Sequence, residues 1–67
     1  MTSRRENLKK VDSAWKHCDK AHAIVLELLS KAEYSQHEDL AKAFEAVRSL
    51  LIECKKLLFY CYERMKS

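Results

Sequence analysis

Four side chains in this sequence are of the types that bind soft metal ions: Cys18, His22, Cys54 and Cys61. On a helix, Cys18 and His22 would lie one turn apart on one face, and Cys54 and Cys61 would share another face. Structural zinc sites need four such ligands, and zinc modules usually present two of them within about two to four residues. Because no cysteine pair has that spacing, we predict no metal site and interpret the cysteines as small apolar residues of a helical core.

The histidines His17, His22 and His37 are the candidates for general bases. No serine or cysteine nucleophile stands beside one of them with a third group to orient it. No Glu precedes a histidine by three residues, as the ligands of di-iron helical bundles require, and a chain without glycine cannot form a glycine-rich phosphate loop. The sequence therefore predicts a protein that is not an enzyme and has no cofactor.

The apolar pattern around these residues is helical along the whole chain. Neither Gly nor Pro interrupts it, and Ser3-Arg4-Arg5-Glu6 and Ser35-Gln36-His37-Glu38 both fit the capping box that begins a helix. Apolar positions recur three and four residues apart, which predicts an all-α protein with helices over about 4–33 and 36–65. The two expected rows are Leu8, Val11, Trp15, Cys18, His22, Val25, Leu29 and Ala32, then Leu40, Phe44, Val47, Leu51, Cys54, Leu58, Cys61 and Met65.

The connection at Glu33-Tyr34-Ser35 is so short that the two helices must pack antiparallel, as a two-helix hairpin. The alternative is a three-helix bundle in which the first helix breaks near Asp12-Ser13 or His17–Asp19. In both cases residues 1–67 form a single domain. A chain of 67 residues buries too little surface to be stable without close helix packing, a metal, disulfides or oligomerisation.

The second helix is more apolar than one hairpin can bury. A turn at Tyr34 and Ser35 places Leu57–Tyr62 opposite Asn7–Asp12, a polar stretch, while the first helix has its own apolar excess at Ile24–Leu29. A second copy, related by a two-fold axis perpendicular to the long axis, would cover one excess with the other, so we predict a homodimeric four-helix bundle. The residues expected at this protein interface are Ile24, Leu28, Leu50, Leu57, Leu58, Phe59, Cys61 and Tyr62.

The predicted function is therefore that of a protein-binding module of coiled-coil type, such as an adaptor, which oligomerises by burying a two-sided apolar helix. A helix of another protein could take the place of the second copy, since helices docked in a foreign groove show the same spacing. The alternative function is that of a nucleic-acid-binding hairpin dimer. The formal charge is +3, and Arg4, Arg5, Lys9 and Lys10 form a dense basic cluster. The predicted topology is similar to that of small RNA-regulatory hairpin dimers, although topology alone does not determine function.

The three cysteines, at irregular spacing, favour a reducing compartment, the cytoplasm or the nucleus. The first residues carry charge where a signal peptide would have an apolar run. The longest apolar runs are far shorter than the ~20 residues that a membrane span needs, so we expect none.

Overall fold

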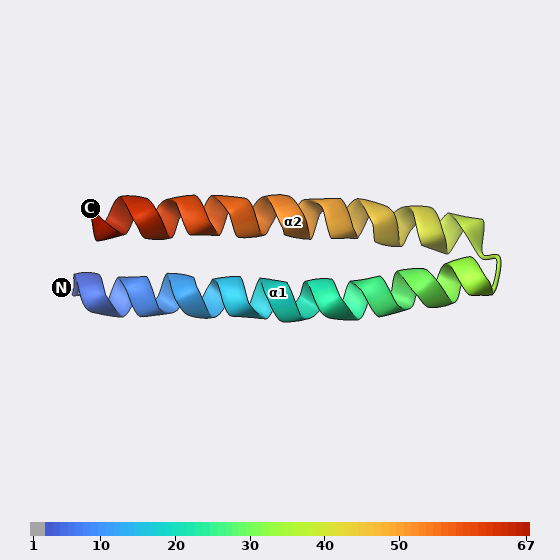
Figure 1. The fold of residues 1–67 in the computed structure, drawn as a ribbon, viewed down its shortest axis with the longest axis horizontal. Coiled ribbons are helices and arrows are strands. Elements are labelled where there is room, and N and C mark those ends of the chain that lie inside the picture. Colours follow the sequence, from blue (N-terminus) through green and yellow to red (C-terminus); the bar gives the residue numbers. More distant parts are fainter. Residues whose placement is uncertain (1–2) are drawn as a thin grey trace.

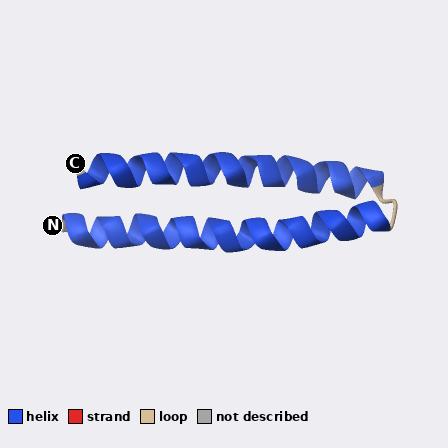
Figure 2. Ribbon diagram, in the orientation of Figure 1, coloured by secondary structure: helices blue, strands red, loops and turns tan. Residues whose placement is uncertain are grey.

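The computed structural model describes residues 3–67 and shows two long helices joined by a tight turn (Figures 1 and 2). Helix α1 spans Arg4–Tyr34 and helix α2 spans Glu38–Lys66. The helices run antiparallel side by side, and the molecule measures 50 × 15 × 14 Å along its principal axes. The predicted all-α hairpin is confirmed. Because α1 continues without a break through Asp12 and His17, the three-helix alternative is wrong.

Both ends of the hairpin are closed by hydrogen bonds. Ser3 caps α1 as predicted, since its Oγ accepts a hydrogen bond of 3.1 Å from the backbone N–H of Glu6. At the same end, the Arg4 guanidinium donates hydrogen bonds of 2.7 Å to the carbonyl of Met65 and 2.8 Å to an oxygen of Ser67. These are among the last acceptors of α2, which have no partner within the helix and lie at the negative end of its dipole. Arg4 thus fastens the start of α1 to the end of α2.

The second predicted capping box is wrong. Ser35 is the C-cap of α1, and the N-cap of α2 is His37, whose side chain makes no capping hydrogen bond. The cause lies at Gln36, which adopts a φ of 60°, in the left-handed region. The N–H of Gln36 bonds to the carbonyl of Glu33, and the N–H of His37 bonds to the carbonyl of Ala32. This is the Schellman arrangement, in which glycine usually occupies the place of Gln36.

The side chains between the helices form two inner rows. On α1 the inner row is the predicted one, and all eight members are buried or half-buried. On α2 the prediction is half right, because Leu40, Val47, Cys54 and Cys61 are exposed and the residues one position later take their places. The inner row of α2 consists of Ala41, Phe44, Arg48, Leu51, Lys55, Leu58, Tyr62 and Met65, all half-buried.

The pairing of the helices also differs from the prediction, because α2 begins only at Glu38. Cys18 Sγ lies 3.7 Å from Cys54 Sγ, and Val11 and Trp15 line one groove together with Leu58 and Tyr62. The Leu57–Tyr62 stretch therefore lies beside Val11–Trp15, about one helical turn from the predicted Asn7–Asp12. Trp15 gives Leu58 and Tyr62 a neighbour that the predicted pairing did not supply.

Candidate functional site

The hairpin leaves most of its large apolar side chains in contact with water. Among the described residues only Leu29 and Ala32 are buried, and α2 contains no buried residue. The exposed fraction is 70 % for Leu50, 57 % for Leu57 and 60 % for Phe59. Folded monomers rarely expose contiguous apolar patches of large size, and such patches mark sites of interaction.

Most of these side chains share one side of the hairpin, here called the apolar face. Each occupies the position just before an inner-row residue, and one step along a helix rotates the side-chain direction by about 100°. Because the two helices are antiparallel and their inner rows face each other, the residue just before an inner-row residue points to the same side of the hairpin on α1 and on α2. The apolar face consists of Ile24 and Leu28 of α1 and of Leu40, Val47, Leu50, Cys54, Leu57 and Cys61 of α2, all of which are exposed.

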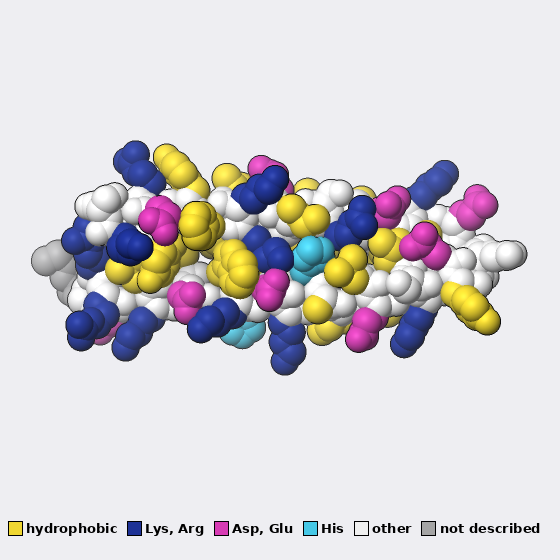
Figure 3. Space-filling view, viewed as in Figure 1, with side chains coloured by type: hydrophobic (Ala, Val, Ile, Leu, Met, Phe, Trp, Pro, Cys, Tyr) yellow, Lys and Arg dark blue, Asp and Glu magenta, His cyan; other side chains and the backbone are white. Residues whose placement is uncertain are grey.

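The opposite side, here called the charged face, holds the positions just after the inner rows. On α2 it mixes both charges with occasional apolar residues, whereas no charged residue interrupts the apolar-face positions of α2 between Leu40 and Cys61. In Figure 1, α1 runs from left to right below α2, so its inner row points upward. Because the helix is right-handed, the residue just after each inner-row residue, which belongs to the charged face, then points toward the viewer. Figure 3 therefore looks onto the charged face, and it shows basic and acidic side chains interspersed among hydrophobic ones.

Lys55 is the centre of the polar contacts between the helices. Its Nζ lies 2.9 Å from Asp19 Oδ1, donates to His22 Nδ1 at 3.0 Å, and sits 5.5 Å from the centroid of the Trp15 ring. The Lys55 side chain is only 16 % exposed, and these partners compensate its charge while its methylene groups pack between the helices. His22 of α1 thus accepts a hydrogen bond from the ammonium group of Lys55 on α2, and this contact joins the two helices.

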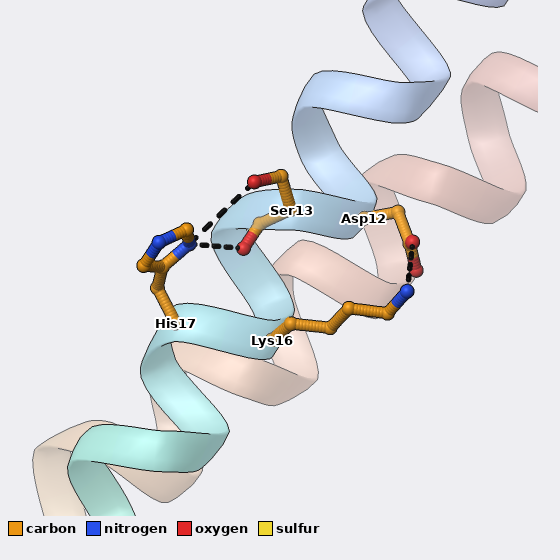
Figure 4. A network of polar contacts seen from close by, with 4 residues as sticks. All are labelled: Asp12, Ser13, Lys16 and His17. Atoms are coloured by element: carbon orange, nitrogen blue, oxygen red, sulfur yellow. Dashed lines mark hydrogen bonds and ion pairs between the residues drawn. The ribbon is translucent and has the colours of Figure 1, made fainter.

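His17 makes its polar contacts within α1 (Figure 4). Its Nδ1 lies 2.7 Å from the Ser13 carbonyl oxygen and 3.5 Å from Ser13 Oγ. On the other side of the same helix, Lys16 Nζ pairs with Asp12 Oδ2 at 3.0 Å. All four residues belong to one helix and are exposed. Contacts of this kind contribute a few tenths of a kcal/mol to a helix at most. The group contains no third side chain that would orient Ser13 as a nucleophile.

The cysteines are free thiols, and two of them meet across the hairpin. The hydrogen bond between Cys18 and Cys54, at an Sγ–Sγ distance of 3.7 Å, raises the pKa of the Cys18 thiol. Within residues 3–67 no three His, Cys, Asp or Glu side chains are grouped so that they could hold a metal ion. The two thiols Cys18 and Cys54 are therefore the closest pair of sulfur atoms that the structure shows between the helices.

The predicted interface residues fall in three places. Ile24, Leu28, Leu50, Leu57 and Cys61 lie together on the apolar face. Two others, Leu58 and Tyr62, belong to the inner row of α2, and Phe59 lies on the charged face. Sequence reasoning assigned the remaining apolar-face residues, Leu40, Val47 and Cys54, to the core. The signal that identifies them is the absence of charge at the α2 positions one before the inner row, from Leu40 to Cys61.

The predicted basic cluster is divided. Arg4 hydrogen-bonds to oxygens of Met65 and Ser67, while Arg5, Lys9 and Lys10 are exposed. A nucleic-acid surface at this end would therefore rest on three basic side chains of α1 and not on four.

Comparison with protein-family models, with curated proteins and with solved structures finds no match to this chain. Over the described residues, neither helix has a stretch that is long and apolar enough to cross a membrane.

Proposed function

We propose that this chain is a non-enzymatic protein–protein interaction and oligomerisation module, whose apolar face binds the helices of a partner. The observation that supports the proposal is the apolar face itself, where six large apolar side chains are 39 % to 70 % exposed. Moving one such side chain from half-exposed to buried contributes about 1 kcal/mol, because full burial contributes ~1.5–3 kcal/mol.

A second copy of the chain is the partner that we propose, and the product would be a four-helix bundle. A hairpin with only two buried residues among those described has little core of its own, and chains of this size commonly gain stability by oligomerisation. In the bundle the apolar faces of the two copies would form the missing core. Each hairpin would then contribute its inner rows and its apolar face to one continuous interior.

The charged face would stay in solvent and remain open to a further protein, as an adaptor requires. A groove of about 320 Å³ lies on it, lined among others by Trp15, Phe59 and Tyr62. Three free thiols, two of them within 3.7 Å, suit a module that works in a reducing compartment.

Thermal unfolding, followed by the helical signal in circular dichroism at a series of protein concentrations, tests the proposal. If folding depends on self-association, the unfolding midpoint rises with concentration by mass action. A midpoint that is high and independent of concentration would contradict the proposal, since it would show a hairpin that is stable alone.

A further inference from the structure

We infer that the two copies associate through their apolar faces in antiparallel orientation, with the turn of one hairpin over the open end of the other. The inference rests on the proposed function and adds to it the orientation of the partner and the residues that meet.

The charges of the hairpin are unevenly distributed along its length. The open half, residues 3–18 and 52–67, contains nine Lys and Arg and four Asp and Glu, a formal charge of +5. The turn half, residues 19–51, contains four Lys and Arg and six Asp and Glu, a formal charge of −2. The net charge of +3 is therefore the sum of a positively charged open half and a negatively charged turn half.

Two stackings with two-fold symmetry bury the apolar face against its own copy. In the parallel stacking the axis runs along the rod, the two open halves coincide, and like charges repel at both ends. In the antiparallel stacking the axis crosses the rod near its middle, so that each positive open half lies on a negative turn half. Charge complementarity of this kind acts on orientation and register more than on affinity, and it favours the antiparallel stacking.

The apolar face fits the same orientation. In the antiparallel stacking α2 lies along α2 of the other copy, so that Val47 of one copy meets Leu57 of the other, and Leu50 meets Cys54. The charge-free row is then matched with itself from Ala43 to Cys61, and only Leu40, at its end, lies opposite a charged residue, Arg64. In the parallel stacking Leu57 would lie on the open half of α1 in the other copy. The apolar-face positions there hold the polar residues Lys10 and His17 beside Ala14.

Isotope-filtered nuclear Overhauser spectroscopy on the unmodified protein tests this inference. Equal amounts of ¹³C-labelled and unlabelled chain are mixed, and only contacts between copies are observed. We expect cross-peaks between methyl groups of Val47 and Leu57. These two residues lie ten positions apart on one helix, about 15 Å, so a contact within one copy is impossible. Ile52 and Phe59, on the charged face, should give no cross-peaks between copies and serve as the internal control.

The other outcomes separate the inference from the proposed function. Cross-peaks between Leu57 and Ala14 of different copies would overturn the antiparallel orientation and leave self-association intact. Cross-peaks at Phe59 would overturn the choice of face. The absence of any contact between copies, together with a monomeric mass in the same sample, would overturn both and would leave a different protein as the occupant of the apolar face.

Discussion

Replacement of Leu57 by glutamine is expected to weaken self-association strongly, whereas replacement of Phe59 by glutamine is not. The two residues form a matched pair, because they stand two positions apart on α2 and are 57 % and 60 % exposed in the hairpin. Two steps along a helix turn the side chain by about 200°, so the two side chains point about 160° apart. Leu57 lies on the apolar face and Phe59 on the charged face.

The size of the effect follows from the exposure of Leu57. Full burial of a leucine contributes ~1.5–3 kcal/mol, and 57 % of Leu57 is still exposed in the hairpin. Association would therefore gain about 1–1.5 kcal/mol per copy. Because a two-fold interface buries the residue twice, L57Q should cost about 2–3 kcal/mol per dimer, or roughly 30- to 150-fold in the dissociation constant. The buried amide of glutamine adds to this cost.

Sedimentation equilibrium of both variants measures the dissociation constants, and circular dichroism at high protein concentration confirms that both remain helical. A weakening by F59Q that equals or exceeds that by L57Q would refute the assignment of the interface to the apolar face. Two variants that both associate like the original chain would show that neither side chain lies in the interface.

Two further predictions concern the turn and the thiol pair. Replacement of Gln36 by glycine should raise the free energy of unfolding by about 0.5–1 kcal/mol in urea titrations, because glycine adopts the φ of 60° without a Cβ clash. The control is Q36A, which keeps the Cβ. Equal stabilisation by Q36G and Q36A would contradict the reasoning. In a Cys61→Ser background, oxidised glutathione should form a Cys18–Cys54 disulfide, with the two electrons and two protons passing to the glutathione sulfurs. The bond should stabilise the hairpin by about 3–4 kcal/mol. It should form faster as the pH rises, because the attacking species is the thiolate and the hydrogen bond with Cys54 raises the pKa of Cys18. Peptide mapping under non-reducing conditions identifies the bond, and a dominant cross-link between copies would contradict the prediction.

The inner row of α1 could be predicted from the sequence, and that of α2 only in part. On α1, one row of apolar residues runs the length of the helix, the extra apolar residues are confined to Ile24–Leu29, and the structure follows that row. On α2, the stretch Leu57–Tyr62 is apolar at every position, so periodicity cannot decide which positions face inward. The polar residues Arg48 and Lys55 then favoured the wrong choice. Lys55 lies inside because Asp19 and His22 compensate it, and a contact between helices cannot be inferred from spacing within one helix.

The turn explains why the pairing of residues between the two helices could not be predicted from the sequence. Ser35 and Glu38 have the spacing of a capping box, but the backbone closes α1 with a Schellman turn in which Gln36 is left-handed. Without a glycine to mark that position, the sequence gives no sign of it. The later start of α2 moves every cross-helix contact by about one turn. The prediction of an apolar excess did not depend on this register, so most of the apolar-face residues could be named in advance.

The molar mass in solution tests the central claim most directly, that the apolar face is covered by a second copy of the chain. We expect size-exclusion chromatography with light scattering, at micromolar concentration and above, to give twice the chain mass of 7.9 kDa. A monodisperse, helical species of 7.9 kDa under the same conditions would contradict it.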